Sequence, residues 1–389
     1  MAKRKKFHYT AIIIGAGPAG LGTALALSRE GIDSLVLESQ DKIGLHARGE
    51  TIRFSPEMED VLYPGFFNKQ TIHRIKKRRY YSHTEKNYVD RTISTENLII
   101  EWPHFIGDIA DIVQKAGAEI RTGIKVTSII EENSIVKGIR AKNLSAKKEE
   151  IILADTVFSC GGVHDPGSFH LHIERFAIDL PIHKRIVRNF NGPHDRLEYY
   201  LHVGKESLPG IGCIFPRGRG EAEIILMPFT NILESPTGLT PFSQVETFVN
   251  EFSENHPTFK SRLEETETYY TVNTLIPMGK VLTRFAPRPG LVMVGDALGH
   301  VDVKGGSGIR TSFLLGYCAG KLGASIIKSG GWSPDKQKLF DTHMMENPQM
   351  KLLKRHALIY GSVRRFLFQR INDPARMDRW WPLLKTLLR

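Results

Sequence analysis

The sequence lacks the features that mark disulfide-rich, metal-binding and membrane-spanning proteins. Its 389 residues include three cysteines, Cys160, Cys213 and Cys318, which are too few and too scattered for a disulfide framework or a metal cluster. No apolar run approaches 18 residues, and the most apolar stretch, Ser312–Ile327, contains Lys321. These absences predict a protein of a reducing, cytoplasmic compartment with no metal site and no membrane-spanning helix.

Basic residues are in excess, and they are unevenly distributed. The net charge is +11. The segment 351–389 holds ten Lys and Arg residues against two Asp residues, and shorter basic runs occur at Lys3–Lys6 and Lys76–Arg79. Such clusters suit an anionic membrane surface, a phosphorylated substrate or nucleic acid, and a solvated helix face is the alternative.

The most informative stretch is Tyr9–Glu38, which has the pattern of a strand, a turn, a helix and a second strand. Ala11–Ile14 is a short apolar run of the kind that forms a buried parallel strand. The sequence GAGPAG follows at Gly15–Gly20, and Leu21–Glu30 has the character of a helix that Gly31 ends. The apolar residues just before Glu38 then predict the second strand.

The glycines and the acidic residue of this unit together predict a dinucleotide site. The first glycine permits a tight turn, the second lets the backbone approach a pyrophosphate, and the third allows close packing of helix and strand. The helix N-terminus offers N–H groups to the anion. Glu38, at the end of the second strand, is placed to accept hydrogen bonds from a ribose. The predicted cofactor-binding residues here are Gly15, Gly17, Pro18, Ala19, Gly20 and Glu38.

A second glycine-rich segment, Gly290–Gly308, predicts another part of the same site. Leu291–Val294 is a short apolar strand, and the Gly-Asp pair after it puts a carboxylate where ligands bind in open α/β sheets. The glycines before the helix Ile309–Ile327 leave its N-terminus open to face the electron-rich edge of a flavin. The residues predicted to contact the cofactor are Gly295, Asp296, Gly306, Gly308 and Ile309.

The rest of the chain predicts an α/β protein with three parts. A Rossmann-like FAD-binding domain is expected from residues 1–178 and 277–330, and its segment 53–75 looks irregular or partly helical. Period-two alternation in the middle third predicts an inserted antiparallel β-sheet domain for the substrate at 179–276. Residues 331–389 are expected to form a basic helical region.

Two shorter stretches of the sequence also predict secondary structure. Arg79–Val89 is rich in aromatic and β-branched residues and predicts one strand. The C-terminal helices are expected to break at Pro348 and Pro374 and to end beside Trp380-Trp381. These tryptophans, with neighbouring Leu, Lys and Arg, suit either a membrane interface or docking onto the main body.

With these motifs in place, nearly the whole chain resembles the geranylgeranyl reductase family of FAD-dependent oxidoreductases, which have the p-hydroxybenzoate hydroxylase-like flavin fold. The resemblance implies FAD as the cofactor, with the backbone near Val126 beside the adenine. It places Gly161, in Cys-Gly-Gly, where this group usually has Asp-Gly. The sequence IGCIFPRGRG at 211–220 looks like the family segment Y-x-W-x-F-P, which implies substrate contacts at Ile211, Cys213, Phe215 and Pro216.

The sequence departs from the family pattern at several of these positions. The family's Cys-Gly-Glu is Arg48-Gly49-Glu50, so that Arg48 offers a cation instead of a thiol. A common flavin-contacting Arg is replaced by Trp102, and a proline of the second fingerprint by Val303, next to Lys304. The candidate catalytic residues are therefore Arg48, Glu50 and Lys304, and for each a loop salt bridge is the alternative interpretation.

The resemblance implies that reduced FAD saturates carbon–carbon double bonds of an isoprenoid lipid or diphosphate, with a proton from the protein or water. Because no second G-x-G-x-x-G follows a later strand, the reductant is expected to dock transiently, as NAD(P)H or a ferredoxin-like carrier. Peripheral binding to an anionic membrane on its inner face is an expectation, and nucleic acid is not an expected partner. The rival hypotheses are an FAD monooxygenase on the same fold and a membrane-docked flavin electron carrier. The absence of W-x-W-x-I-P disfavours a halogenase.

Overall fold

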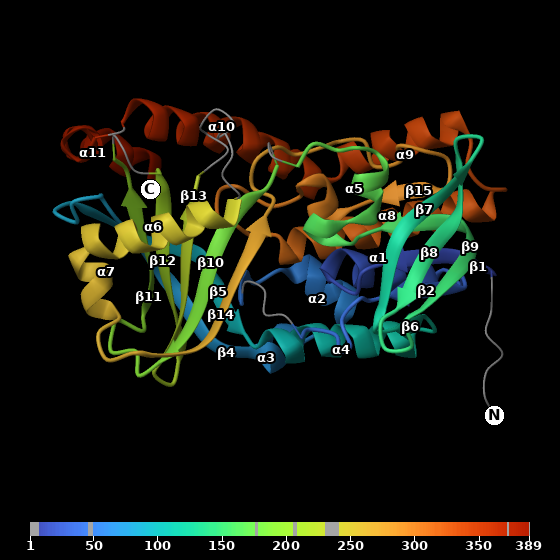
Figure 1. Cartoon of the computed structure of the whole chain (residues 1–389), viewed down its shortest axis with the longest axis horizontal. Helices are drawn as coiled ribbons and strands as arrows, with labels where there is room; N and C mark the ends of the chain where they lie inside the picture. The colour runs from blue at the N-terminus through green and yellow to red at the C-terminus, as the bar shows by residue number, and fades with distance from the viewer. Residues whose placement is uncertain are drawn as a thin grey trace.

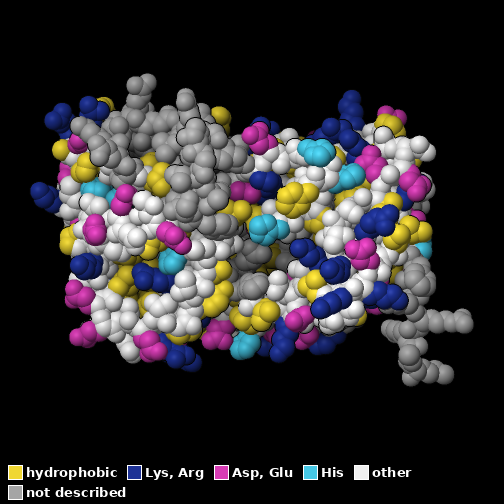
Figure 2. All heavy atoms as spheres, in the orientation of Figure 1, with side chains coloured by type: hydrophobic (Ala, Val, Ile, Leu, Met, Phe, Trp, Pro, Cys, Tyr) yellow, Lys and Arg dark blue, Asp and Glu magenta, His cyan; other side chains and the backbone are white. Residues whose placement is uncertain are grey.

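A computed structural model describes residues 8–45, 50–175, 178–204, 208–229, 241–371 and 373–388 of the chain. Two β-sheets lie side by side along the long axis of the molecule, and helices cover their outer faces (Figure 1). On the face shown in Figure 2, Lys and Arg side chains lie among Asp and Glu side chains, and several basic groups gather over the half that holds the first sheet. The positive surplus is therefore not confined to the C-terminal helices.

The first sheet contains the predicted nucleotide unit. Its strands are β1 (His8–Ile14), β2 (Ser34–Leu37), β6 (Glu119–Arg121), β7 (Ile124–Glu132), β8 (Ile135–Asn143), β9 (Lys148–Ser159) and β15 (Leu291–Met293). Their order is β6-β2-β1-β9-β8-β7, and β15 also pairs with β9. Because β6, β2, β1, β9 and β15 are joined by parallel pairs, their carboxyl ends lie at one edge.

Two helices, α1 (Pro18–Arg29) and α8 (Ile309–Lys328), pack closely against each other beside this sheet. Glycines make the approach possible, since a Cβ on Gly22 would collide with the backbone of α8 at Phe313, and a Cβ on Gly316 with the backbone of α1 at Ala19. Thr23 donates a hydrogen bond across the contact to the Gly316 carbonyl at 3.0 Å. Helix α4 (Trp102–Lys115) packs on the other side of α1.

The second sheet is larger than the segment 179–276 that was expected to form it. Its strands are β3 (Thr51–Arg53), β4 (Thr71–Tyr81), β5 (Tyr88–Ile100), β10 (Leu180–Arg188), β11 (Arg196–His202), β12 (Gly210–Gly218), β13 (Glu221–Pro228) and β14 (Glu267–Ile276). The order is β14-β10-β13-β12-β11-β4-β5-β3. Three strands therefore come from residues 51–100, and β11 joins them by running parallel to β4.

The hairpin of β4 and β5 corrects two local predictions. The expected single strand Arg79–Val89 is the end of β4, a turn and the start of β5, with Arg79 opposite Asp90 and Tyr81 opposite Tyr88. The segment 71–75, expected to be irregular or helical, is the start of β4. The long-range pairing of β4 with β11 decides this, because stacked tyrosines on both faces join the two strands, Tyr80 on Tyr199 at 4.7 Å and Tyr81 on Tyr200 at 4.6 Å.

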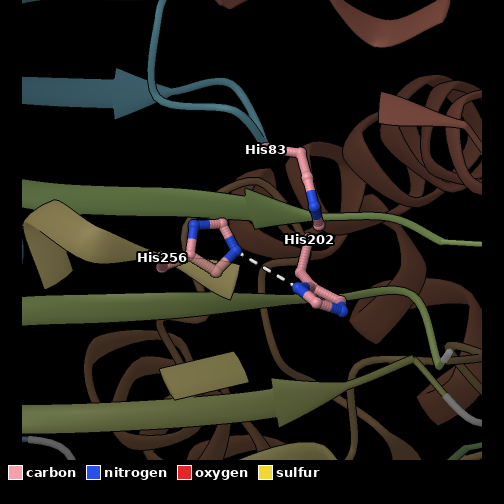
Figure 3. Close-up of side chains that lie close together, drawn as sticks. All are labelled: His83, His202 and His256. Atoms are coloured by element: carbon pink, nitrogen blue, oxygen red, sulfur yellow. Dashed lines mark hydrogen bonds between the residues drawn. The ribbon is translucent and has the colours of Figure 1, made fainter. Parts of the chain in front are cut away.

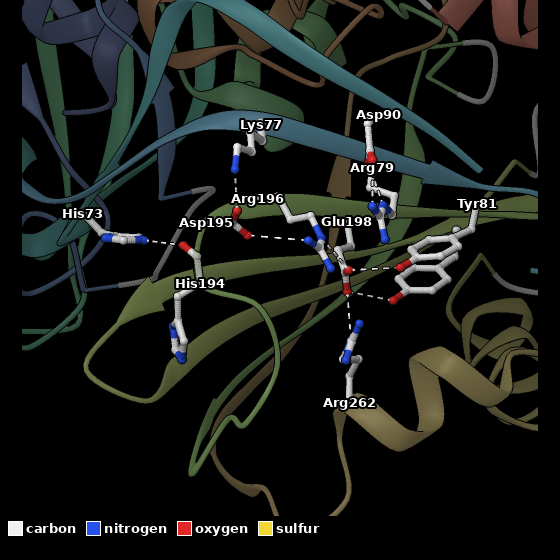
Figure 4. Close-up of polar contacts among 11 residues, drawn as sticks. His73, Lys77, Arg79, Tyr81, Asp90, His194, Asp195, Arg196, Glu198 and Arg262 are labelled. Carbon is white, nitrogen blue, oxygen red and sulfur yellow. Dashed lines mark hydrogen bonds and ion pairs between the residues drawn. The ribbon is translucent and has the colours of Figure 1, made fainter.

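The two faces of the second sheet have different neighbours. The face with Tyr81 and Tyr200 packs under α6 (Pro241–Asn255) and α7 (Pro257–Arg262), whose phenylalanines complete an apolar core. On the same strands Glu198 is buried, and Tyr81, Tyr200, Arg196 and Arg262 all donate hydrogen bonds to its carboxylate (Figure 4). The face with Tyr80 and Tyr199 carries a separate apolar cluster that includes Ile211, Cys213 and Phe215.

The remaining elements are helical. They are α2 (Pro56–Leu62), α3 (Phe66–Gln70), α5 (Pro166–His170), α9 (Pro334–Glu346), α10 (Pro348–Arg370) and α11 (Pro374–Leu388), with short 3-10 turns at Gly162–His164 and Gly295–Leu298. The breaks at Pro348 and Pro374 fall where they were predicted. Trp381 docks onto the body in an apolar cluster, whereas Trp380 is exposed. Within the described residues, no helix combines the length and the apolar character needed to cross a membrane.

Three buried histidines, His83, His202 and His256, meet at the end of the second sheet (Figure 3). His202 Nδ1 lies 3.2 Å from His256 Nε2, and the Val203 N–H donates to His83 Nδ1 at 3.1 Å. Burial lowers the pKa of His202 to about 3 and of His83 to about 4, and it lowers the pKa of His256 although Glu85 lies 3.3 Å away. The rings are therefore neutral near pH 7.

This cluster is a set of side chains that could hold a metal, since one nitrogen from each ring lies within 4.8 Å of the others. In the structure, however, some of these ring nitrogens take part in hydrogen bonds. Because the Val203 N–H occupies Nδ1 of His83, the proton of that neutral ring sits on Nε2. These hydrogen bonds account for only part of the cluster, because the buried Nε2 atom of His202 has no hydrogen-bond partner among the described residues.

We expect these histidines to make the fold sensitive to acid. Their folded pKa values lie below the unfolded value of about 6.5, so their contribution is fully present above that pH and is lost as the pH falls towards 4. Each ring can remove up to about 1.4 kcal/mol per pH unit. Urea unfolding at pH 7, 6 and 5 should show a falling midpoint.

The variant His202→Phe should have a shallower pH dependence than the wild type, whereas His104→Gln, at an exposed position, should not change it. A midpoint that stays constant from pH 7 to pH 5 in the wild type would contradict this account.

Candidate functional site

The predicted cofactor residues converge at the carboxyl edge of the first sheet. Gly15 follows β1 and donates its N–H to the Leu37 carbonyl at the end of β2, at 2.8 Å. Cys160, after β9, donates to the Ile14 carbonyl at 3.0 Å, and Val294, after β15, donates to Ser159 at 3.2 Å. Four loops that are distant in sequence thus form one continuous edge.

The glycine loop after β1 leaves one side open to a ligand. Gly15 has a φ of +91°, and a Cβ there would lie 2.8 Å from the Cys160 carbonyl oxygen. A Cβ on Gly20 would collide with the Gly15 carbonyl. Gly17 differs, because no atom lies within 4 Å of a Cβ placed there, and no side chain caps the N-terminus of α1 at this residue. Two glycines therefore serve packing and the middle one borders space, as a pyrophosphate cradle requires.

Glu38 stands at the mouth of this loop. Its carboxylate accepts hydrogen bonds from the backbone N–H groups of Ala16 and Gln40, both at 2.9 Å. Its own carbonyl accepts from Ile124, at the start of β7, at 2.9 Å. This pairing brings Val126 close to the same end of the site, with its side chain buried. The structure therefore brings Glu38 and the β7 backbone together, as the resemblance implies for the adenosine end.

The second glycine-rich segment adjoins the first through α1 and α8. Gly295 has a φ of +78°, and a Cβ there would lie 2.8 Å from the Cβ of Ala19. The carboxylate of Asp296 lies 3.5 Å from the Cβ position of Gly308, which begins α8 without a side-chain cap. Gly306 has a φ of +64°, a conformation that favours glycine. An acceptor and a helix N-terminus thus face the same region, which fits the ribityl chain and ring of a flavin.

His300 and Arg175 support this segment, and the sequence analysis did not identify them. The Gly295 N–H donates to His300 Nδ1 at 3.2 Å, and His300 Nε2 lies 3.1 Å from the Leu282 carbonyl. Burial lowers the pKa of His300 to about 4, which keeps the ring neutral and able to accept. Arg175 donates to the carbonyls of Asp296 and Ala297 at 3.1 and 2.7 Å. The only sequence feature that could have indicated these contacts is a histidine five residues after Gly295.

Gly161 is held by a buried carboxylate that was also missed. Asp165 accepts hydrogen bonds from the Gly161 N–H at 2.8 Å, from Ser159 Oγ at 2.8 Å and from the Ser168 N–H at 2.9 Å. Burial raises its pKa against the effect of these bonds. The family's Asp-Gly is Cys-Gly here, and an aspartate four residues later contacts the glycine backbone.

The two candidate catalytic residues in the described part of the chain, Glu50 and Lys304, have different partners. Arg48 lies outside the described residues. Glu50 is buried in an ion pair with Arg217, which follows Phe215-Pro216 in the segment that resembles the family motif. Lys304 lies in the loop before α8, with Nζ 5.2 Å from the centre of the Tyr360 ring. Glu50 is thus already engaged by a cation that the sequence analysis did not associate with it.

The predicted substrate residues lie along β12. Every second side chain of this part of β12 points to the sheet face that carries Tyr80 and Tyr199, and these side chains are Ile211, Cys213 and Phe215. Pro216 follows them in the same strand. Burial raises the pKa of the Cys213 thiol, which makes it inert as a nucleophile at neutral pH. A surface hollow of about 880 Å³ lies beside α9 and α10, where Gln337 and Lys354 line it. None of the predicted site residues line this hollow.

We expect the glycines of the first loop to separate cofactor binding from folding. Gly17→Ala should preserve the fold and weaken FAD binding by on the order of tenfold, about 1.4 kcal/mol, because its Cβ enters the space of the pyrophosphate. Gly20→Ala should lower the unfolding temperature of the protein without cofactor. Thermal unfolding of both variants, with FAD titrations followed by flavin fluorescence, provides the measurement. Equal losses of stability in the two variants would contradict the assignment.

Comparisons with known proteins agree with this geometry. A family model described as an NAD(P)-binding Rossmann-like domain matches residues 13–69, which include the glycine loop and Glu38. The digeranylgeranylglycerophospholipid reductase of Thermoplasma volcanium is 23% identical over 355 residues, which cover 89% of this chain and 85% of the relative. The protein of the same name from Methanosarcina acetivorans is 27% identical over 339 residues, covering 84% and 78%.

Solved structures show the same fold. A geranylgeranyl bacteriochlorophyll reductase-like protein from Thermoplasma acidophilum has a TM-score of 0.74 at 20% identity, covering 94% of this chain and 92% of that one. A flavin-dependent brominase has a TM-score of 0.67 at 16% identity, covering 95% and 93%. The α/β fold class expected from the sequence is confirmed. The chain is similar along most of its length to digeranylgeranylglycerophospholipid reductases, and the resemblance to the geranylgeranyl reductase family drawn from its motifs is confirmed.

Proposed function

We propose that this protein is an FAD-dependent oxidoreductase that reduces carbon–carbon double bonds in a geranylgeranyl-type isoprenoid lipid. One observation carries the proposal. The loop of the second fingerprint packs, through Val301 and Val303, into an apolar cluster with Leu201 and Ile211 of the second sheet. The cofactor edge and an apolar sheet face are thereby placed next to each other, as reduction of an apolar alkene requires.

The apolar character of this face suits an alkene better than a polar aromatic substrate. Tyr80, Tyr199, Ile211 and Phe215 pack there among aliphatic side chains. An alkene offers few groups for hydrogen bonding, so its position depends on the shape of an apolar surface and on exclusion of water. The names of the relatives, which act on digeranylgeranylglycerophospholipids, support this substrate class.

Bound FAD supplies the hydride-transfer chemistry in this proposal. The chain's own residues bind and orient it: the loop at Gly15–Gly20 holds the pyrophosphate, Glu38 the ribose, and Asp296 the ribityl hydroxyls. The N-terminus of α8 favours negative charge on the ring by its dipole. Glu50 acts as a positioning residue, since its ion pair with Arg217 ties the start of β3 to the end of β12.

We also propose sources for the proton and the electrons. On the sequence alone, Arg48 is the candidate cation for the reacting centre. The sequence holds no second G-x-G-x-x-G after a strand, so we infer that NAD(P)H or a ferredoxin-like carrier docks transiently. On this account one site serves reductant and substrate in turn.

The decisive test is anaerobic incubation of the FAD-loaded protein with dithionite and geranylgeranyl lipids. We expect the lipid mass to rise by about two units for each reduced bond, because one hydride and one proton are added. Mass spectrometry of the extracted lipid provides the measurement, and Gly17→Ala with its weakened FAD binding is the matched control.

Two outcomes would replace the proposal. Oxygen consumption stoichiometric with the reductant, with a hydroxylated product, would indicate a monooxygenase on the same fold. Normal FAD binding and reduction with no change in any isoprenoid lipid would indicate an electron carrier.

We further propose that the C-terminal helices place the protein on an anionic membrane from the cytoplasmic side. Leu358, Ile359, Trp380 and Leu383 are exposed apolar side chains on α10 and α11, which lie along one edge of the molecule (Figure 1). Basic side chains on the same helices are Lys351, Lys354, Arg355, Arg376, Arg379 and Lys385. Exposed apolar groups beside cations suit the interface of an anionic bilayer.

Vesicle co-sedimentation tests this proposal. The protein should bind vesicles rich in phosphatidylglycerol at low salt and bind less well to pure phosphatidylcholine. Leu383→Glu should reduce binding, whereas Leu339→Glu, at an exposed position on α9, should not. Equal vesicle binding by both variants and the wild type would contradict the proposal that the C-terminal helices contact the membrane.

A further inference from the structure

A pocket of about 480 Å³ lies against β5 of the second sheet and includes cations in its lining. Its wall is a continuous stretch of β5, residues 90–95, together with Arg53 at the end of β3 and Lys304 from the loop before α8. Arg91 also lines it, and the carboxylate among the lining residues is that of Asp90. The pocket therefore carries three cations against one carboxylate.

The guanidinium of Arg53 is the most informative group in the pocket. Its side chain is partly buried, and among the described residues no hydrogen bond or ion pair engages its guanidinium. Burial lowers the pKa of Arg53, and the guanidinium of Arg78 acts in the same direction, whereas the carboxylate of Asp302 opposes them. A partly desolvated cation with cationic neighbours is costly unless an anion is present.

The nearby carboxylates are already engaged. Asp90 accepts two hydrogen bonds from Arg79, both at 2.6 Å (Figure 4). Asp302, on the side of Lys304, contacts His356 Nδ1 at 2.7 Å. Both carboxylates therefore have partners other than Arg53.

A buried arginine behind the pocket adds a further unused donor. Arg78 is 5% exposed, and its Nη2 donates to Asn97 at 2.8 Å, while its Nε has no partner among the described atoms. Its guanidinium lies 5.9 Å from the centre of the Tyr199 ring. The cationic character thus extends from the pocket wall to the apolar face of the sheet.

The backbone of β5 is also available on this side. β4 pairs with β5 along the stretch, but β3 reaches β5 only opposite Asn97–Ile99. Residues 90–95 therefore form a strand edge next to the pocket. Backbone N–H groups at such an edge are donors for a phosphate oxygen.

The pocket adjoins the apolar surface assigned to the isoprenoid chain. Val303, which precedes Lys304, packs against the apolar cluster that contains Ile211 and Met278. An amphiphile with its anionic end among the cations can therefore lay its chain along this surface towards the cofactor edge.

We propose that the pocket at Arg53, Arg91 and Lys304 binds the phosphate group of a prenyl substrate, so that the enzyme prefers phosphorylated isoprenoids over the corresponding alcohols. This inference rests on the proposed function. A lipid headgroup and a prenyl diphosphate share the chemistry that these cations recognise, a phosphate ester bearing one or two negative charges.

The experiment compares a geranylgeranyl phosphate lipid with its dephosphorylated alcohol in the wild type and in Arg53→Gln. Loss of a charge-assisted hydrogen bond should raise KM for the phosphorylated substrate about 10- to 100-fold, with kcat little changed. KM for the alcohol should stay the same. Arg53→Lys should recover part of the preference, and Arg140→Gln, at an exposed site on β8, should match the wild type.

Inorganic pyrophosphate serves as a direct probe of the pocket. It should compete with the phosphorylated substrate and not with the alcohol, and equilibrium dialysis should show weaker binding of pyrophosphate to Arg53→Gln. Comparison of phosphoglycerol and diphosphate substrates then identifies which headgroup is preferred. FAD content and unfolding temperature of Arg53→Gln should match those of the wild type.

The inference is overturned if Arg53→Gln affects both substrates equally or if pyrophosphate binds the variant and the wild type alike. If the wild type reduces neither substrate, the proposed function fails, and the dialysis measurement still decides whether the pocket holds a phosphate.

Discussion

The close contact between α1 and α8 is the constraint on which the rest of the structure depends. One helix begins at the glycine loop after β1, and the other at the glycine loop after β15. Because Gly22 and Gly316 let the two backbones touch, both helix N-termini end at the same edge of the first sheet. The two glycine loops predicted to bind the cofactor, which are almost 300 residues apart in the sequence, are thereby held in a fixed relation.

The second sheet is positioned against this edge by apolar packing and by charge. Val301, in the cofactor loop, belongs to the same cluster as Leu201 and Trp381, so the loop, the sheet and α11 share one core. Cations from β3 and from the loop before α8 line one pocket beside β5. An interface that is apolar in one part and cationic in another matches the two ends of an amphiphilic molecule.

The sequence predicted those parts of the fold that depend on local chemistry. The first βαβ unit, the strands β10 to β14 and the breaks at Pro348 and Pro374 all follow from glycine, proline or hydrophobic periodicity close in the chain. The β4–β5 hairpin was missed because β4 carries exposed Lys and Arg side chains in place of a clear alternation, and because its place in the sheet depends on pairing with β11, more than 100 residues away.

The candidate site shows the same division. Glycine motifs predicted the edge where the two loops meet, since the positive φ angles at Gly15 and Gly295 favour glycine in the sequence. The polar contacts that support this edge could not be predicted from the sequence. The contacts of His300 with Leu282, of Asp165 with Gly161 and of Glu50 with Arg217 depend on tertiary geometry, and each of these residues would be an ordinary loop or strand residue without it.

The buried ion pair of Glu50 and Arg217 also limits how this protein can change over evolution. Removal of Arg217 alone leaves the Glu50 carboxylate without its cation in a site with almost no exposure to water, a loss of about 3–5 kcal/mol in comparable pairs. Removal of Glu50 costs less, because Arg217 Nε also lies 3.5 Å from the carboxylate of Glu221. A substitution of Arg217 is therefore expected to require a change at Glu50. Because Glu50 precedes β3 and Arg217 directly follows Phe215-Pro216 of the segment that resembles the family's substrate motif, variation beside that motif is coupled to variation in the loop that leads into the second sheet.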